Sequence, residues 1–288
     1  FVWLTEHLGN QTTPHIPIEN FDVAVSAMDE IRQEQMAPDL LITYGGHIVS
    51  KQIKKYLRNH PPKEHWHIAS DGKIADLFGC LTTVIEMDPF EFLEKIAFLL
   101  ENKPTNYPLM WENWCKIIPE PALPYSQISV TGDLIKGLPS PCSLHLANSS
   151  TVRYAPLFAL PKEVEVCCNR GVNGIEGSLS SAIGYAAASM NINFVIIGDL
   201  SFFIDMNALW MNHVRNNLRI LLFNNEGGEI FHTLPGMEKN SKSRPYITAE
   251  HQTSAQGWAE ERGFQYIKVT DADEWADVLP IFTSSEEH

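Results

Sequence analysis

The chain has 288 residues, which exceeds the usual size of a single domain and predicts two domains or one large α/β domain. Hydrophobic residues make up 44% and charged residues 19%, a composition that excludes an intrinsically disordered chain. No run approaches the roughly 20 apolar residues that a membrane-spanning helix needs, so we expect no membrane partner. The 21 basic and 35 acidic residues give a net charge of −14 without a local Lys/Arg run, which argues against a nucleic-acid partner.

The five cysteines are odd in number and lack Cys-x-x-Cys spacing, which indicates neither a disulfide framework nor a zinc site. Buried thiols in a reducing compartment are the simpler interpretation, and we expect a cytoplasmic location. The chain begins at Phe1 without a signal-peptide pattern. We therefore interpret it as a fragment of a longer protein.

The first part of the chain alternates strands and helices. An apolar run at 40–44 predicts a strand, which is followed by a Gly-Gly turn and a helical pattern from about residue 51. Three further elements are expected here: strands at 66–69 and 82–85, and a helix over 90–100. Between about residues 102 and 124, prolines alternate with Trp111 and Trp114, a composition that predicts a surface connector and a domain boundary.

The second part of the chain alternates again, which implies a mostly parallel sheet covered by helices. Its expected elements are strands at 143–146, 164–166, 194–197 and 220–223, and helices at 178–190 and 203–214. The predicted fold class is α/β, with two domains that each contain a mostly parallel sheet flanked by helices. We place these domains at 1–120 and 121–288.

Polar residues follow two predicted strands of the second domain. One strand ends in Gly198-Asp199-Leu200-Ser201, where the serine is suited to cap the next helix, and the other ends in Asn224-Asn225-Glu226-Gly227-Gly228. A carboxylate, an amide oxygen and a carbonyl freed by a glycine turn are ligands for Mg²⁺ or Ca²⁺, and helix N–H groups suit phosphate oxygens. Each motif alone is more often a structural cap or turn. Together, at strand–helix–strand spacing, they indicate a metal–diphosphate site.

The Gly-Asp start and Asn-Asn end of this region resemble the diphosphate-binding motif of the thiamine diphosphate enzymes. Leu200 replaces the usual third glycine, and with segments 168–177 and 224–231 it resembles the menaquinone-pathway family of 2-succinyl-5-enolpyruvyl-6-hydroxy-3-cyclohexene-1-carboxylate synthases. The resemblance is close over about residues 147–235. It implies that 1–120 is a middle, transhydrogenase-like nucleotide-fold domain and that 121–288 is the diphosphate-binding domain.

The resemblance also implies roles for individual residues. Asp199, Asn225 and the carbonyl of Gly227 would hold Mg²⁺ or Mn²⁺, and Ile175 would prop the cofactor in its bent conformation. Buried helix-start packing is an equally good interpretation of Ile175 from sequence alone. The implied cofactor-binding residues are Ser149, Ile175, Gly198, Asp199, Leu200, Ser201, Asn225, Gly227, Gly228, Glu229 and Ile230.

Two arginines match family positions that hold substrate carboxylates. A guanidinium group meets a carboxylate through two parallel hydrogen bonds, which suits Arg153 and Arg170 to this role. A lone arginine is otherwise more often a solvated surface residue. Lys51, on a shorter motif, and Phe231 complete the substrate-binding residues that the resemblance implies.

By this resemblance the intact enzyme uses thiamine diphosphate and a divalent metal to decarboxylate 2-oxoglutarate and add the succinyl carbanion equivalent to isochorismate, as a homodimer or homotetramer. The alternatives are another thiamine diphosphate-dependent 2-oxo acid decarboxylase or carboligase, or a non-catalytic metal–diphosphate binding module. The family carries its activating glutamate in an N-terminal pyrimidine-binding domain. We therefore expect no catalytic residue in this chain, and an isolated chain that is inactive or nearly so.

Overall fold

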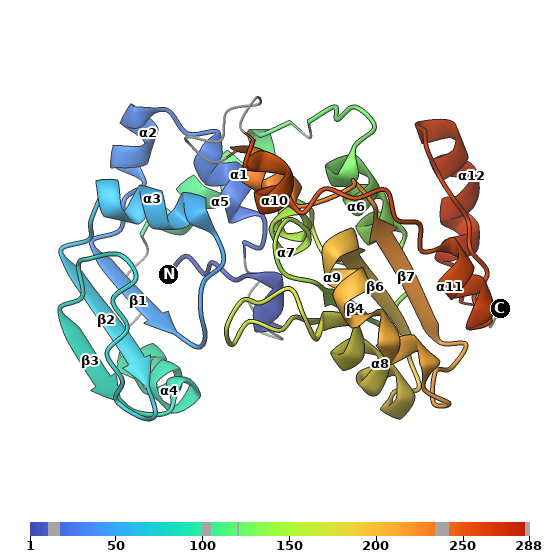
Figure 1. Cartoon of the computed structure of the whole chain (residues 1–288). Helices are drawn as coiled ribbons and strands as arrows, with labels where there is room; N and C mark the ends of the chain where they lie inside the picture. The colour runs from blue at the N-terminus through green and yellow to red at the C-terminus, as the bar shows by residue number, and fades with distance from the viewer. Residues whose placement is uncertain (11–17, 100–104, 120, 234–241, 286–288) are drawn as a thin grey trace. The chain divides into compact units, whose positions relative to one another are not determined.

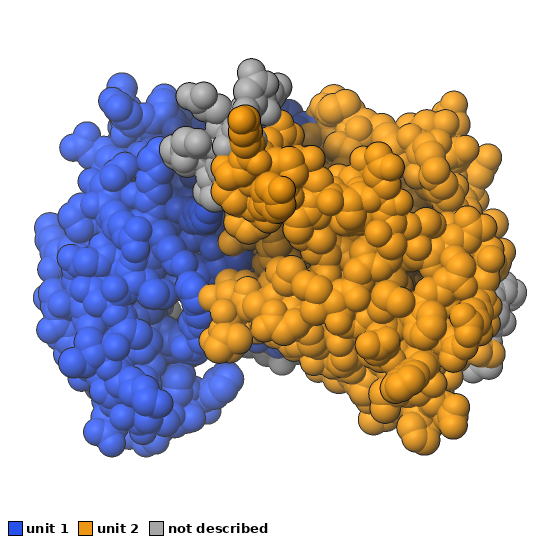
Figure 2. Space-filling model, viewed as in Figure 1, with its two compact units in different colours: residues 1–121 blue, residues 122–288 orange. Residues whose placement is uncertain are grey.

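The computed structural model describes residues 1–10, 18–99, 105–119, 121–233 and 242–285. It separates into two compact units, residues 1–121 and 122–288, which Figure 2 distinguishes by colour. Each unit contains one parallel sheet accompanied by helices (Figure 1), so the predicted α/β class with mostly parallel sheets is confirmed. Among the described residues, no helix combines the length and apolar character needed to cross a membrane.

The first unit is built on a three-stranded parallel sheet in the order β1-β2-β3. Its strands are β1 (Leu40–Tyr44), β2 (Glu64–Ala69) and β3 (Thr83–Glu86). Its helices are η1 (His7–Gly9), α1 (Phe21–Ser26), α2 (Glu30–Gln35), α3 (Lys51–Asn59), α4 (Pro89–Leu99) and α5 (Tyr107–Ile117). Apolar side chains of α1, α3 and α5 form a common buried cluster, which fixes these helices to one another.

The surface connector predicted over about 102–124 is wrong for its central part. Residues 107–117 form α5, and Trp111 is only 2% exposed within the core of the first unit. The indole N–H of Trp114 donates to the carbonyl of Ala24 at 2.9 Å. Pro108 lies in the first turn of α5, where its missing N–H costs no hydrogen bond. The tryptophans therefore anchor a core helix.

The second unit is built on a four-stranded parallel sheet in the order β5-β4-β6-β7. Its strands are β4 (Cys142–Leu146), β5 (Val164–Cys167), β6 (Ile192–Gly198) and β7 (Leu218–Phe223). Its helices are α6 (Gln127–Gly137), α7 (Thr151–Tyr154), η2 (Ala155–Leu157), α8 (Ser178–Ala188), α9 (Asp199–Asp205), η3 (Met206–Trp210), η4 (Glu229–Thr233), α10 (Arg244–Thr248), α11 (Gln256–Glu261) and α12 (Ala272–Phe282).

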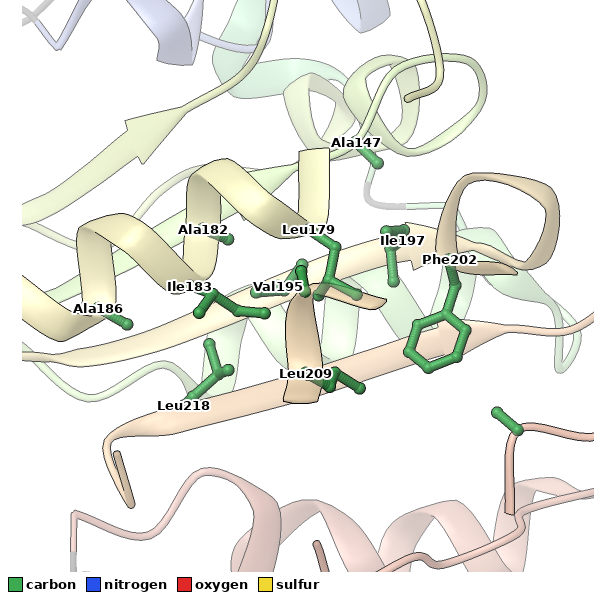
Figure 3. Packing of buried hydrophobic residues seen from close by; sticks show 12 residues of the cluster. Ala147, Leu179, Ala182, Ile183, Ala186, Val195, Ile197, Phe202, Leu209 and Leu218 are labelled. Carbon is green, nitrogen blue, oxygen red and sulfur yellow. The ribbon is translucent and has the colours of Figure 1, made fainter. Parts of the chain in front are cut away.

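Strand β6 is the centre of the second unit because both of its faces are buried. Val195 and Ile197 pack into the cluster that contains Leu179 of α8, as Figure 3 shows. On the other face, the ring of Phe194 lies 5.9 Å from the ring of Phe282 in α12. Successive side chains of a strand point to opposite faces, so this apolar run is covered from both sides. The packing fixes the end of β6, where the candidate site begins.

The helix after β6 begins earlier than predicted. The sequence predicts one helix over 203–214, whereas α9 starts at Asp199 and gives way to the 3₁₀ helix η3 at Met206. The Asp199 carboxylate accepts the N–H of Leu200 at 2.7 Å, which satisfies one first-turn donor directly at the strand end. Ser201 is therefore the third residue of α9, and its predicted capping role is wrong, because Gly198 occupies the cap.

Two helical glycines give a matched test of the packing in the second unit. An alanine Cβ at Gly132 in α6 would lie 2.4 Å from the Phe158 ring, whereas one at Gly184 in α8 would meet nothing within 4 Å. We predict that Gly132→Ala lowers the free energy of unfolding by about 1–3 kcal/mol through overpacking. Gly184→Ala should raise it by up to about 1 kcal/mol through helix propensity. Urea unfolding measures the free energy of unfolding of both variants. Equal changes in the two variants would contradict this packing.

Candidate functional site

The strands of the second unit end side by side, and the candidate residues follow them. Leu146 pairs with Ile196, and Gly198 pairs with Phe223, so β4, β6 and β7 reach the same edge of the sheet. Ligands of open α/β sheets bind outside these carboxyl ends. The segments that follow the four strands are 147–149, 168–170, 199–201 and 224–228.

Asp199 is an enclosed candidate ligand, at 3% exposure. Its Oδ1 accepts the N–H of Leu200 at 2.7 Å, and its Oδ2 accepts the N–H of Gly227 at 2.9 Å. The Nε2 of His251 lies 3.2 Å from the same Oδ2. A carboxylate has about four lone-pair sites. The described residues use three of them, which leaves one for a cation.

Gly227 lies where the loop after β7 passes close to another backbone segment. Its φ of 146° belongs to the region that favours glycine, and an added Cβ would lie 2.7 Å from the carbonyl oxygen of Thr248. The same oxygen accepts the N–H of Gly228 at 2.6 Å. Thr248 is fully buried and ends α10. The two glycines therefore let the loop turn against this helix end.

Asn225 is exposed and donates through its amide Nδ2 to the Oε2 of Glu229 at 2.8 Å. Gln127 donates to the same oxygen at 3.0 Å. Because the amide nitrogen of Asn225 binds Glu229, the amide oxygen is the atom suited to a cation. Glu229 thus orients a candidate metal ligand, which gives its carboxylate a positioning function in the predicted site.

Ser201 and Ile175 are joined by a hydrogen bond from the hydroxyl of Ser201 to the carbonyl of Ile175. This bond links the first turn of α9 to the loop before α8. The hydroxyl hydrogen of Ser201 is therefore committed, but its backbone N–H, in the first turn of a helix, has no partner within that helix. Ser149, at the end of β4, adopts a φ of 81°, a strained conformation for a residue other than glycine.

Arg153 and Arg170 form a pair of half-buried cations beside the β4 end. Arg153 donates from Nη1 to the carbonyl of Ser149, and Arg170 donates from Nη1 to the Oδ1 of Asn148 at 2.6 Å. Burial lowers the pKa of Arg153, and the positive charge of Arg170 lowers it further. Within the described residues, nothing accepts a hydrogen bond from the buried Nε of either arginine. Two adjacent cations with open donors are suited to an anionic ligand.

Asn148 is a site residue that the sequence did not single out. It is 3% exposed, and its amide donates to the carbonyls of Asn169 at 2.7 Å and Gly174 at 2.5 Å while its oxygen accepts from Arg170. It therefore joins the loops after β4 and β5. His251 was also missed. Its only sequence signal is an isolated histidine in a polar segment, which predicts no particular partner.

The other predicted site residues are placed by the element to which each belongs. Lys51 is the exposed first residue of α3 and belongs to the first unit. Phe231 lies in η4 and is 36% exposed. The others are Gly198 at the cap of α9, Leu200 in its first turn, Gly228 in the loop after β7, and Ile230 in η4.

The donor set at this edge fits a hard divalent cation and a phosphorylated ligand. One carboxylate, one amide oxygen and one loop carbonyl are oxygen donors of the kind that Mg²⁺ and Mn²⁺ prefer, and the cation would take its other ligands from water and phosphate. The carbonyl of Gly227 accepts the N–H of Glu229 at 3.0 Å, which leaves its second lone pair. First-turn N–H groups of α9 add donors for phosphate oxygens.

Nearly the whole chain aligns with curated proteins of one name. It is 74% identical over 286 residues to the 2-succinyl-5-enolpyruvyl-6-hydroxy-3-cyclohexene-1-carboxylate synthase of Phocaeicola vulgatus, with 99% of this chain and 51% of that protein covered. The synthase of Bacteroides fragilis is 66% identical over 287 residues, with 99% of this chain and 52% of that protein covered. That of Flavobacterium psychrophilum is 36% identical over 270 residues, with 92% and 49% covered.

This chain belongs to the 2-succinyl-5-enolpyruvyl-6-hydroxy-3-cyclohexene-1-carboxylate synthase family. The family resemblance stated from the sequence is thereby confirmed. The chain spans about half the length of the curated synthases that it matches. No protein-family model matches it.

Gly227→Ala tests the close approach of the β7 loop to α10. The added Cβ would meet the Thr248 carbonyl and force a strained φ, so we predict a loss of about 1–3 kcal/mol in the free energy of unfolding and faster amide exchange at Gly228. Gly171→Ala is the control, because its Cβ would have open space. Urea unfolding and hydrogen exchange give both readouts. An unchanged Gly228 amide in Gly227→Ala would contradict the loop geometry.

Proposed function

We propose that the intact protein carrying this chain uses thiamine diphosphate and Mg²⁺ or Mn²⁺ to decarboxylate 2-oxoglutarate and add the succinyl carbanion equivalent to isochorismate in menaquinone biosynthesis. The names of the curated relatives support the synthase part of this proposal. When bound, thiamine diphosphate supplies the electron sink that lets a 2-oxo acid lose carbon dioxide. The residues of this chain hold the cofactor and the substrates.

Asp199, Asn225 and the carbonyl of Gly227 are proposed to hold the metal ion. The support for this role is that three separate segments, the end of β6, the loop after β7 and the residues after α10, are hydrogen-bonded around one buried carboxylate. The diphosphate would bind beside them, contacting Ser149 and the backbone N–H of Ser201. Ile175, whose carbonyl is held by Ser201, would support the cofactor from the neighbouring loop.

The observation that carries the substrate assignment is the arginine pair. Arg153 and Arg170 are close enough for the charge of one to lower the pKa of the other, and both keep a buried Nε without an acceptor in the described part of the chain. The proposed substrates, 2-oxoglutarate and isochorismate, each carry two carboxylates. A monocarboxylate such as pyruvate offers fewer acceptors to these donors, so the pair favours the dicarboxylate reaction over other 2-oxo acid decarboxylases.

Five further assignments stay predictions. Lys51 and Phe231 are predicted to contact substrate, and the assembly is predicted to be a homodimer or homotetramer. A cytoplasmic location and the inactivity of the isolated chain are likewise untested expectations.

Asp199→Ala tests the metal and cofactor assignment. Removing the only carboxylate of the donor set should abolish Mg²⁺-dependent binding of thiamine diphosphate by the intact protein, measured by isothermal titration calorimetry. Asp277→Asn, an exposed carboxylate change on α12, is the control and should bind as the wild type does. Unchanged affinity in Asp199→Ala would remove this carboxylate from the site.

Arg170→Lys tests the substrate assignment. Lysine keeps the charge but loses the planar pair of donors, so kcat/KM for 2-oxoglutarate should fall about 10- to 100-fold, as expected for a lost charged hydrogen bond. Release of carbon dioxide from 2-oxoglutarate and from pyruvate, with and without isochorismate, is the measurement. Arg215→Lys, at an exposed position, is the matched control.

Two outcomes of this assay would overturn the proposed reaction. Wild-type release from pyruvate alone would keep the cofactor site but indicate another 2-oxo acid decarboxylase. Release from neither acid would favour a non-catalytic metal–diphosphate binding module.

A further inference from the structure

His251 approaches Asp199 from a distant part of the sequence. It follows α10, 52 positions after Asp199, and its Nε2 lies 3.2 Å from the Asp199 Oδ2. The two side chains are 16% and 4% exposed, so the contact is shielded from solvent. A hydrogen bond in such a place is strong and holds its geometry. The contact therefore constrains the carboxylate that is proposed to bind the metal ion.

The partners of the imidazole ring fix which nitrogen carries the hydrogen. The backbone N–H of Thr253 lies 3.1 Å from the Nδ1 of His251, and a backbone N–H can only donate. Nδ1 must therefore be the unprotonated acceptor, and in the neutral ring Nε2 carries the hydrogen. Nε2 is then the donor to Asp199. The ring of Phe203 packs edge-on at 5.3 Å and 87°, which holds the imidazole plane in this direction.

The backbone of His251 contacts the loop that contains the other two candidate metal ligands. The N–H of His251 donates to the carbonyl of Glu226 at 3.1 Å. Glu226 lies between Asn225 and Gly227, the other two candidate ligands. His251 thus contacts the carboxylate through its side chain and the ligand loop through its main chain. One residue ties both parts of the site together.

The hydrogen bonds to Asp199 also distinguish its two oxygens. Each carboxylate oxygen has about two lone-pair sites. Oδ2 accepts from Gly227 and faces His251, so both of its sites are used, whereas within the described part of the chain Oδ1 accepts only from Leu200. The vacant lone pair is therefore on Oδ1. Without His251, a second site on Oδ2 would open, and the carboxylate would be held by the N–H groups of Leu200 and Gly227 with one contact fewer.

We propose that His251 is a positioning residue for the metal ion: its Nε2–H occupies Oδ2 of Asp199 so that the cation is bound through Oδ1. The inference rests on the proposed function, because it assumes that Asp199 is a metal ligand. Residues that orient metal ligands typically change metal affinity about 10- to 100-fold when they are removed. His251 is not a catalytic residue, and its effect is exerted through Asp199.

Three variants separate this function from a purely structural one. His251→Gln can place an amide donor near the Nε2 position, and it should bind metal within about 3-fold of the wild type. His251→Asn can keep an acceptor near Nδ1 for the Thr253 N–H but cannot reach Asp199. His251→Phe keeps the ring packing on Phe203 and loses both hydrogen bonds. The last two should bind metal about 10- to 100-fold more weakly.

The measurement is Mn²⁺ titration of the intact protein at saturating thiamine diphosphate, followed by the electron paramagnetic resonance signal of free Mn²⁺. Near-wild-type Mn²⁺ affinity in His251→Gln, together with weaker binding in His251→Asn and His251→Phe, supports the proposal. Equal Mn²⁺ affinity in all variants overturns it. Wild-type affinity in His251→Asn with weaker binding in His251→Gln also overturns it, because the effect would then come from the hydrogen bond to the Thr253 N–H. If the wild type binds no Mn²⁺ with the cofactor, the proposed function itself fails, and the inference fails with it.

A second readout does not depend on the cofactor. Nitrogen-15 NMR of the histidine ring in the wild-type protein should show the Nε2–H tautomer for His251, assigned by its absence from His251→Gln. The Nδ1–H tautomer would overturn the proposal, because Asp199 would then face a nitrogen without a hydrogen. Thermal melting of each variant separates weak metal binding from unfolding. A variant that binds weakly but melts as the wild type does supports the positioning function.

Discussion

The geometry of the candidate site depends on one buried carboxylate. Asp199 is enclosed, at 3% exposure, where the central strand β6 ends. An unpaired carboxylate in such a place would be costly, and hydrogen bonds from Leu200, Gly227 and His251 offset this cost. Each donor belongs to a different segment. Burial of this charge therefore determines where α9 begins and where the loops after β7 and α10 must lie.

A second constraint is the positive charge of Arg153 and Arg170 at the other end of the edge, which no acidic side chain of the described residues pairs with. Arg153 and Arg170 are partly buried close to one another, and Asn148 holds one of them through a neutral oxygen rather than a carboxylate. An acidic partner from the chain would neutralise the pair and close it to ligands. The partners of both guanidinium groups, the Asn148 side chain for Arg170 and the Ser149 carbonyl for Arg153, are neutral and leave the positive charges for a ligand. A buried negative group and an open positive pair on one sheet edge thus suit a metal ion and an anionic substrate, respectively.

The sequence predicted the strands well because buried parallel strands are continuous apolar runs, as in 194–197 and 220–223. It failed where side-chain hydrogen bonds override local propensity. Serine is a common capping residue and Ser201 was predicted to cap the helix, but the Asp199 carboxylate accepts a first-turn N–H and the helix starts at Asp199, four residues before the predicted start at 203. Prolines around Trp111 predicted a connector, yet burial of the indole makes this segment a core helix. Local patterns contain no information about which distant residue supplies such contacts.

Asn148 and His251 show the same limit within the site. Motif spacing identified Asp199 and Asn225 because they follow neighbouring strands. In contrast, His251, which contacts Asp199, and Asn148, which contacts Arg170, come from loops with no recognisable pattern. The most direct test is a crystal structure of the intact protein with thiamine diphosphate and Mn²⁺, with the metal located by its anomalous signal. The peak should lie within coordination distance of Asp199 Oδ1, Asn225 Oδ1 and the Gly227 carbonyl. A peak at another position, or one bound through Asp199 Oδ2, would contradict this account.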